Sequence, residues 1–193
     1  MGHKILWHPA KFIDERTKKD FARDGYWFSL WSSIIVGLTV ILLSLIFTKS
    51  GYYVEELTIK KGIVIFLVSF SVYYLLNILS AFLTREIVGM LKKDILFYKA
   101  LAAVSYPYFL LSVGFALMTI FAIFPGINIL TPIIGIIFIA RSYGIYIRFL
   151  HEYAKLDNIE AYVASVILIS ALTFGFIIGV NILSAVPGNV FGM

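Results

Sequence analysis

Five long apolar stretches, separated by short polar links, account for most of this chain. They run over residues 27–48, 62–83, 101–124, 127–148 and 161–185. Each is close to or longer than the ~20 residues that a helix needs to cross about 30 Å of hydrocarbon. An unpaired backbone amide costs several kcal/mol in lipid, so each stretch should be helical or buried between helices. The pattern predicts an all-α, polytopic membrane protein with a single five-helix transmembrane domain over residues 27–186.

Composition supports the membrane prediction. Hydrophobic residues make up 61% of the chain and charged residues 14%, whereas soluble domains are about 25% charged. The net charge of +5 comes from residues in the links, with no basic stripe on a soluble face, so we expect anionic lipid headgroups and not nucleic acid as its partner. The chain has no cysteine, which excludes disulfides, thiol nucleophiles and iron–sulfur clusters.

The basic residues predict how the protein is oriented. With five crossings, 13 Lys and Arg residues fall on one side of the membrane and 3 on the other. The positive-inside rule then places the N-terminus in the cytoplasm, and the C-terminus with the short tail 187–193 outside. A re-entrant turn at Pro125-Gly126 is the alternative that would break this odd count.

Two cytoplasmic segments have amphipathic character. Residues 1–26 are basic and carry apolar anchors around Pro9, which fits either a short interfacial helix or a loosely ordered tail. The link Thr84–Lys99 is more regular, because its apolar residues fall near one helical face. These residues are Ile87, Val88, Leu91, Ile95 and Tyr98. We expect this link to be helical and to lie along the cytoplasmic surface.

Polar residues at membrane depth are the default candidates for function. Arg141 lies about two thirds of the way along the fourth stretch, and Arg148 and Glu152 follow on the same helical face. Glu86, in the second link, is at a compatible depth to pair with them. These four residues form either a basic site for a phosphate, headgroup or carboxylate, or a structural group in which Arg141 snorkels and pairs with Glu86. We favour the structural interpretation.

Other intramembrane features predict helix packing. Asn77 and Ser80 are expected to hydrogen-bond to neighbouring helices. Pro107 and Pro132 lie inside the third and fourth stretches, where each removes a backbone hydrogen bond and can kink a helix. Gly175 and Gly179 form a Gly-x-x-x-Gly pair in the fifth stretch, which favours close helix approach within the bundle and also permits a homo-oligomer.

The residues that catalysis needs are scarce. No apolar stretch carries Asp or Glu at mid-depth, and the three histidines do not have a metal-ligand spacing with carboxylates. No glycine-rich phosphate loop or paired-carboxylate arrangement occurs. We therefore predict a protein that is not an enzyme, with no catalytic residues, no metal and no cofactor.

Three short stretches resemble the prokaryotic branch of the Yip domain family (Ypt/Rab-interacting, or YIPF-like, membrane proteins). They are Trp7-His8-Pro9-Ala10-Lys11-Phe12-Ile13, then Lys99-Ala100-Leu101 leading into Ser105-Tyr106-Pro107-Tyr108, and Tyr143-Gly144 followed by His151-Glu152-Tyr153-Ala154-Lys155-Leu156 and Ala161. The Asp-Leu-Tyr-Gly-Pro motif of eukaryotic members has no counterpart in this chain. Their long GTPase-binding region is likewise replaced by about two dozen residues.

The resemblance implies five spans, a cytoplasmic N-terminus and a role in membrane organisation or trafficking. The leading hypothesis is a non-enzymatic integral membrane protein of Yip type, in the cell membrane of a prokaryote, that binds protein or lipid partners at its cytoplasmic face. The alternative is a small transporter or channel in which Arg141 faces an anion pathway. That alternative predicts a polar cavity that reaches Arg141.

Overall fold

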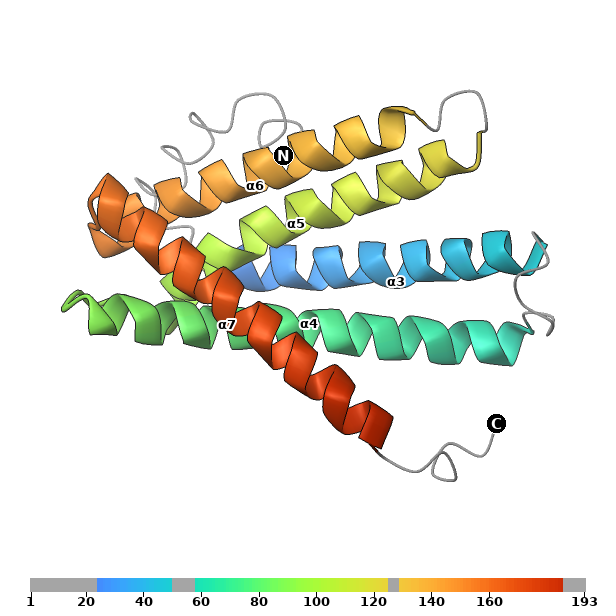
Figure 1. Ribbon diagram of the computed structural model, residues 1–193, viewed down its shortest axis with the longest axis horizontal. Coiled ribbons are helices and arrows are strands. Elements are labelled where there is room, and N and C mark those ends of the chain that lie inside the picture. The colour runs from blue at the N-terminus through green and yellow to red at the C-terminus, as the bar shows by residue number, and fades with distance from the viewer. Residues whose placement is uncertain (1–23, 50–57, 125–128, 186–193) are drawn as a thin grey trace.

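The computed structural model describes residues 24–49, 58–124 and 129–185, and these form five helices with no strand among them. The helices are α3 (Gly25–Lys49), α4 (Ile59–Met90), α5 (Phe97–Ala122), α6 (Leu130–Ala154) and α7 (Asn158–Ala185) (Figure 1). All five are long and apolar enough to cross a membrane. The predicted all-α, five-span architecture is confirmed. The segment 1–23, the turn at Pro125-Gly126 and the tail 187–193 lie outside the described residues.

The link Thr84–Lys99 is not a separate surface helix, as the sequence pattern had indicated. Residues 84–90 continue α4, residues 91–96 form a turn, and α5 begins at Phe97. The apolar face of the link packs inward, because Ile87, Val88 and Ile95 are buried in a core shared with α6 and α7. The amphipathic pattern was therefore correct, but the partner of its apolar face is protein and not the bilayer surface.

Pro132 also differs from the prediction. It is the third residue of α6, in the first turn, where its missing N–H would have no intrahelical partner. It starts the helix and does not interrupt it. Pro107, by contrast, lies inside α5 and is buried.

Helix α5 forms the centre of the bundle and packs against α3, α4 and α6. Residues 100–107 are all buried, and three of them are alanines. Small side chains let the neighbouring backbone come close, which drives helix association in lipid, where apolar burial alone gives little preference for protein contacts. Such a backbone approach occurs at Gly25, where an added Cβ would lie 2.8 Å from the backbone N of Ala102.

Glycines also accept large side chains from neighbouring helices. A Cβ at Gly114 of α5 would lie 2.6 Å from the ring of Phe138 of α6, and a Cβ at Gly135 of α6 would lie 2.8 Å from Met118 Sδ of α5. This reciprocal arrangement interlocks α5 and α6. Gly37 of α3 accepts a phenylalanine of α4 in the same way.

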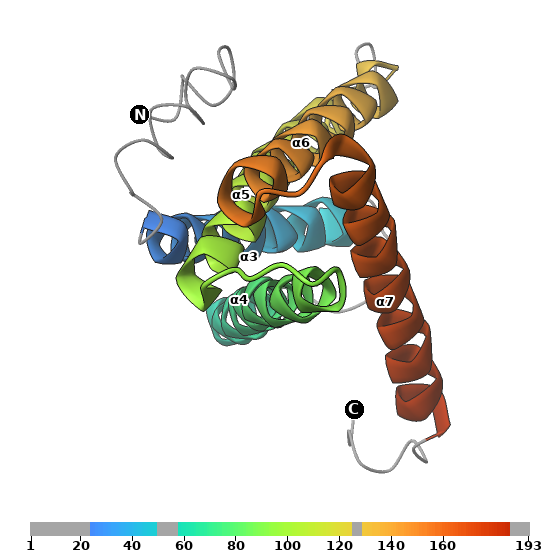
Figure 2. The same ribbon diagram turned by 90° about the vertical axis from the view of Figure 1, so that its left-hand side faces the viewer.

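Helix α7 is set apart from the other four. It runs obliquely across them in Figure 1 and lies beside the bundle in the perpendicular view of Figure 2. Its first half packs inward, since Ala161, Ala164 and Leu168 are buried. Further along, a Cβ at Gly175 would meet nothing within 4 Å. The close packing expected within the bundle at Gly175 is therefore not found, and the surroundings of Gly179 lie outside what the structure describes.

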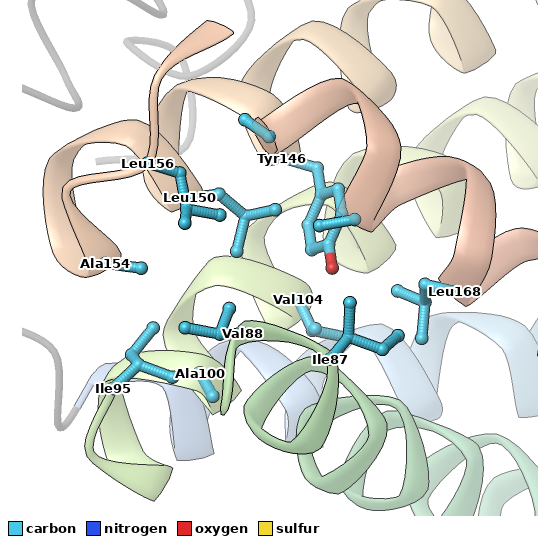
Figure 3. Close-up of a cluster of buried hydrophobic side chains, with 12 residues drawn as sticks. Ile87, Val88, Ile95, Ala100, Val104, Tyr146, Leu150, Ala154, Leu156 and Leu168 are labelled. Carbon is cyan, nitrogen blue, oxygen red and sulfur yellow. The ribbon is translucent and has the colours of Figure 1, made fainter. Parts of the chain in front are cut away.

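The largest core lies where α4 and α6 end and α5 and α7 begin. The buried residues there are Ile87, Val88, Ile95, Ala100, Val104, Tyr146, Leu150, Ala154, Leu156, Ala161, Ala164 and Leu168 (Figure 3). Four helices and the two turns between them contribute to it. We call this the turn end of the bundle, after the turns 91–96 and 155–157.

Candidate functional site

The predicted polar group is only partly assembled. Arg141 is exposed and Arg148 and Glu152 are half-buried, all three along one face of α6 as predicted. Glu86 is exposed on α4.

The α4–α5 turn has a lysine in a left-handed conformation as its second residue. The φ angle of Lys92 is 57°, in a region that glycine usually occupies. The N–H of Lys92 donates to Gly89 O at 3.0 Å and the N–H of Lys93 donates to Val88 O at 3.3 Å. These two bonds form a Schellman motif, which satisfies carbonyls that the end of α4 would otherwise leave unpaired.

The α6–α7 turn also contains a left-handed lysine. Lys155 is left-handed, with a φ of 54°, and closes α6. His151 Nδ1–H donates to Leu156 O at 2.6 Å across the turn. Asp157 and Glu160 then form a capping box at the start of α7, each side chain accepting the other's backbone N–H at 2.7 and 2.9 Å.

Both turns are anchored in the core. Ile95 follows the first left-handed lysine and Leu156 the second, and these two side chains are 3% and 0% exposed. They meet the same buried cluster (Figure 3). The lysines at the tips of the turns are exposed, so the fold presents them at fixed positions.

A second polar feature lies between the helices and is built from hydroxyl groups. Ser80 of α4 hydrogen-bonds to Tyr108 of α5 at 2.9 Å, and Thr84 of α4 to Tyr146 of α6 at 2.9 Å. The interhelical role predicted for Ser80 is confirmed. None of these groups carries charge, so the layer ties helices together at low desolvation cost.

The layer continues to α7 through Tyr143 and Ser165, whose hydroxyl oxygens are 2.7 Å apart. Ser165 uses its own proton on Tyr162 O at 2.6 Å, so Tyr143 is the donor of the pair. Asn77 does not bridge helices as predicted, because its Nδ2 donates to Tyr73 O within α4.

An apolar pocket of about 210 Å³ lies beside this layer, between α5, α6 and α7. Its walls are Val104, Pro107, Tyr108, Leu111, Ile139, Ser142, Tyr143, Tyr146, Leu168, Ile169 and Leu172. Arg141 is not among them, although Ser142, the next residue of α6, is. An anion pathway through Arg141 predicts a polar cavity that reaches this residue. This pocket is apolar and does not include Arg141.

Sequence reasoning missed both turn lysines and the pocket. The Asp157-x-x-Glu160 spacing could have indicated the start of α7. Nothing in the sequence marks Lys92 or Lys155 as left-handed, because glycine is the usual signal. The pocket involves three helices, and its tyrosines look like ordinary members of an aromatic-rich chain.

No group of three or more metal-ligating side chains occurs among the described residues. A scan against protein-family models and comparisons with curated proteins and with solved structures each gave no match.

Proposed function

We propose that this multi-pass membrane protein is a non-enzymatic, Yip-type scaffold that organises membranes by binding protein or lipid partners at its turn end. The turn end would be the cytoplasmic face. The resemblance of three short stretches to the Yip family supports this, as does the excess of basic residues predicted for that side. Crosslinking from the turn end separates a protein partner from a lipid one.

The observation that carries the proposal is the pair of left-handed lysines. A non-glycine residue in this conformation costs roughly 1–2 kcal/mol. The attraction of a lysine to the negative end of a helix dipole is worth about 0.3–1 kcal/mol, which offsets only part of that cost. Strained residues that persist are concentrated at functional sites. Lys92 and Lys155 therefore support a binding role for the two turns.

The chemistry around the lysines indicates what they would bind. Lys92, Lys93 and Lys155 are exposed, and Asp94 and Asp157 are exposed among them. Lysines on a fixed turn suit anionic headgroups, at about 1 kcal/mol for each residue near the surface. The neighbouring carboxylates lower that attraction and suit a protein surface with charges of both signs.

The transporter alternative has less support. Arg141 is exposed on α6 and does not line the pocket between the helices. The polar groups that bridge α4, α5, α6 and α7 are neutral hydroxyls, which cannot neutralise an anion in transit.

Single cysteines test the orientation cleanly, because the chain has none of its own. Lys93→Cys reports on the turn end and Lys61→Cys on the opposite end of α4. In intact cells, a membrane-impermeant maleimide should label position 61 and leave position 93 unlabelled until the membrane is opened. Labelling of position 93 from outside would refute the cytoplasmic assignment.

Photo-crosslinkers at the same two positions test the binding. The protein would be reconstituted in neutral vesicles and in vesicles containing an anionic lipid, each with and without cytosol. Crosslinks from position 93 to anionic lipid, or to a cytosolic protein that competes with it, support the proposal and identify which partner is used. Equal yields from positions 93 and 61 under all conditions would contradict it.

A further inference from the structure

The pocket between α5, α6 and α7 lies within membrane-spanning helices. Its volume of about 210 Å³ exceeds the roughly 150 Å³ of an engineered apolar cavity that binds benzene. Its walls are aliphatic side chains, a proline and the hydroxyl-bearing residues Tyr108, Ser142, Tyr143 and Tyr146. No charged side chain lines it. A ligand here must therefore be uncharged and mostly apolar.

Ser142 is the unusual residue of this wall. It is 3% exposed, and its Oγ has no hydrogen-bond partner among the described residues. Most other buried hydroxyls in the spans donate to a carbonyl three or four residues earlier in their own helix. Examples are Ser32, Ser33, Thr39, Ser105, Ser112 and Thr119. Ser142 Oγ is thus a buried donor at the edge of an apolar pocket.

Water is a poor occupant for this pocket. A buried water needs two to four polar partners. The hydroxyls of Tyr108, Tyr143 and Tyr146 already pair with Ser80, Ser165 and Thr84. Ser142 alone would hold a water by one bond, against walls that are otherwise apolar.

We propose that this pocket binds a neutral lipid whose single polar group is a hydroxyl or carbonyl oxygen, which accepts the proton of Ser142 Oγ. The apolar part of the ligand fills the space bounded by Val104, Leu111 and Leu172. The occupant enters from the bilayer, because the lining residues Ile139 and Ile169 are 60% and 52% exposed although they belong to membrane-spanning helices.

An apolar helix of a second copy would fit this pocket less well. Aliphatic side chains from another helix would fill the volume and leave the Ser142 hydroxyl unpaired, at the desolvation cost that a buried donor carries. A lipid oxygen removes that cost. The inference does not depend on which partner binds at the turn end.

Photoreactive analogues can test the proposal on the full-length protein in phosphatidylcholine nanodiscs. The probes are a long-chain alcohol, a long-chain ketone, an alkane of equal length and the corresponding fatty acid. We expect saturable crosslinking of the alcohol or the ketone to α5, α6 and α7, with weaker labelling by the alkane and by the ionised fatty acid. The ratio of alcohol to ketone identifies which oxygen is preferred.

Two variants, each with a matched control, test the hydrogen bond to Ser142 and the location of the ligand. Ser142→Ala should weaken binding of the oxygen-bearing probe about fivefold, as expected for one hydrogen bond, and leave the alkane unchanged. Ser112→Ala removes a buried hydroxyl that is satisfied within its own helix and should change neither. Ile139→Trp fills the pocket from its rim and should abolish saturable labelling. Ile133→Trp, exposed on the same helix but outside the pocket, should not.

Four results would overturn the proposal or the role it gives to Ser142. Labelling that does not saturate and spreads over the outer faces of all the helices would mean bulk lipid contact only. Equal labelling of Ile139→Trp and the wild type would place the ligand elsewhere. A change of oligomeric state in Ile139→Trp would mean that a second copy occupies the pocket. An unaltered alcohol affinity in Ser142→Ala would overturn the role given to the serine.

Discussion

The contact between Gly25 and Ala102 sets the distance between α3 and the central helix, and Gly25→Ala is the change that tests it. The new Cβ would lie 2.8 Å from the N and 2.9 Å from the Cα of Ala102, and 3.2 Å from the carbonyl carbon of Leu101. All three atoms belong to the backbone, so no side chain can rotate away. The two helices would have to separate by about half an ångström, and overpacking of this kind typically costs 1–3 kcal/mol.

The matched control is Gly144→Ala. Gly144 lies in the interior of α6, and a Cβ there would meet nothing within 4 Å. Alanine should therefore stabilise the helix by roughly 0.5–1 kcal/mol through its lower conformational entropy in the unfolded chain. The two glycine-to-alanine changes are thus predicted to shift the free energy of unfolding in opposite directions.

The assay is equilibrium unfolding in mixed micelles of rising SDS fraction, followed by far-UV circular dichroism. We expect the Gly25→Ala midpoint to fall, with an unfolding constant roughly 5- to 150-fold larger than that of the wild type. A Gly25→Ala protein as stable as Gly144→Ala would show that α3 and α5 are not held at backbone contact, and the account of the bundle centre would be wrong.

Further changes test the remaining contacts. Gly37→Ala should lower the free energy of unfolding by about 1–2 kcal/mol, because the new Cβ would meet the ring of Phe66. Phe66→Leu should recover part of that loss only when combined with Gly37→Ala. Additive effects of the two changes on the unfolding midpoint would contradict this. A double-mutant cycle of Thr84→Val and Tyr146→Phe should give a coupling of roughly 0.6–1.7 kcal/mol if their 2.9 Å bond holds α4 to α6, and zero coupling would refute it. Lys92→Gly should raise the free energy of unfolding by roughly 0.5–1 kcal/mol, because glycine accepts the positive φ without strain. Lys93→Gly should lower it, and both are measured in the same unfolding assay.

Much of the fold was predictable because the bilayer imposes it. A helix must be long and apolar to cross, so the five spans could be located from length and composition. The ends were less accurate. Polar residues such as Arg85 do not stop a helix, so α4 continues to Met90, well past the predicted boundary at residue 83. The amphipathic pattern of the second link was visible, but the pattern alone does not distinguish a lipid surface from a protein core as the partner.

The helix-packing positions were harder to predict from the sequence, and the glycines show why. The Gly-x-x-x-Gly spacing drew attention to Gly175, yet Gly175 meets nothing within 4 Å, while Gly25 and Gly114 make close contacts without any motif. Spacing shows that a helix has a small-residue face. It does not show whether a neighbouring helix lies against that face.

The sequence by itself determined that this protein lies in a lipid bilayer, how many spans it has and where its charged links fall. The physical reason is that hydrocarbon excludes charge and unpaired backbone groups wherever they occur in the chain. Only the tertiary structure decided which apolar faces meet protein, that two turns end helices on left-handed lysines, and that Ser142 borders a pocket. Lipid tails and buried side chains are about equally apolar, so hydropathy carries no information on which way a residue faces inside a membrane.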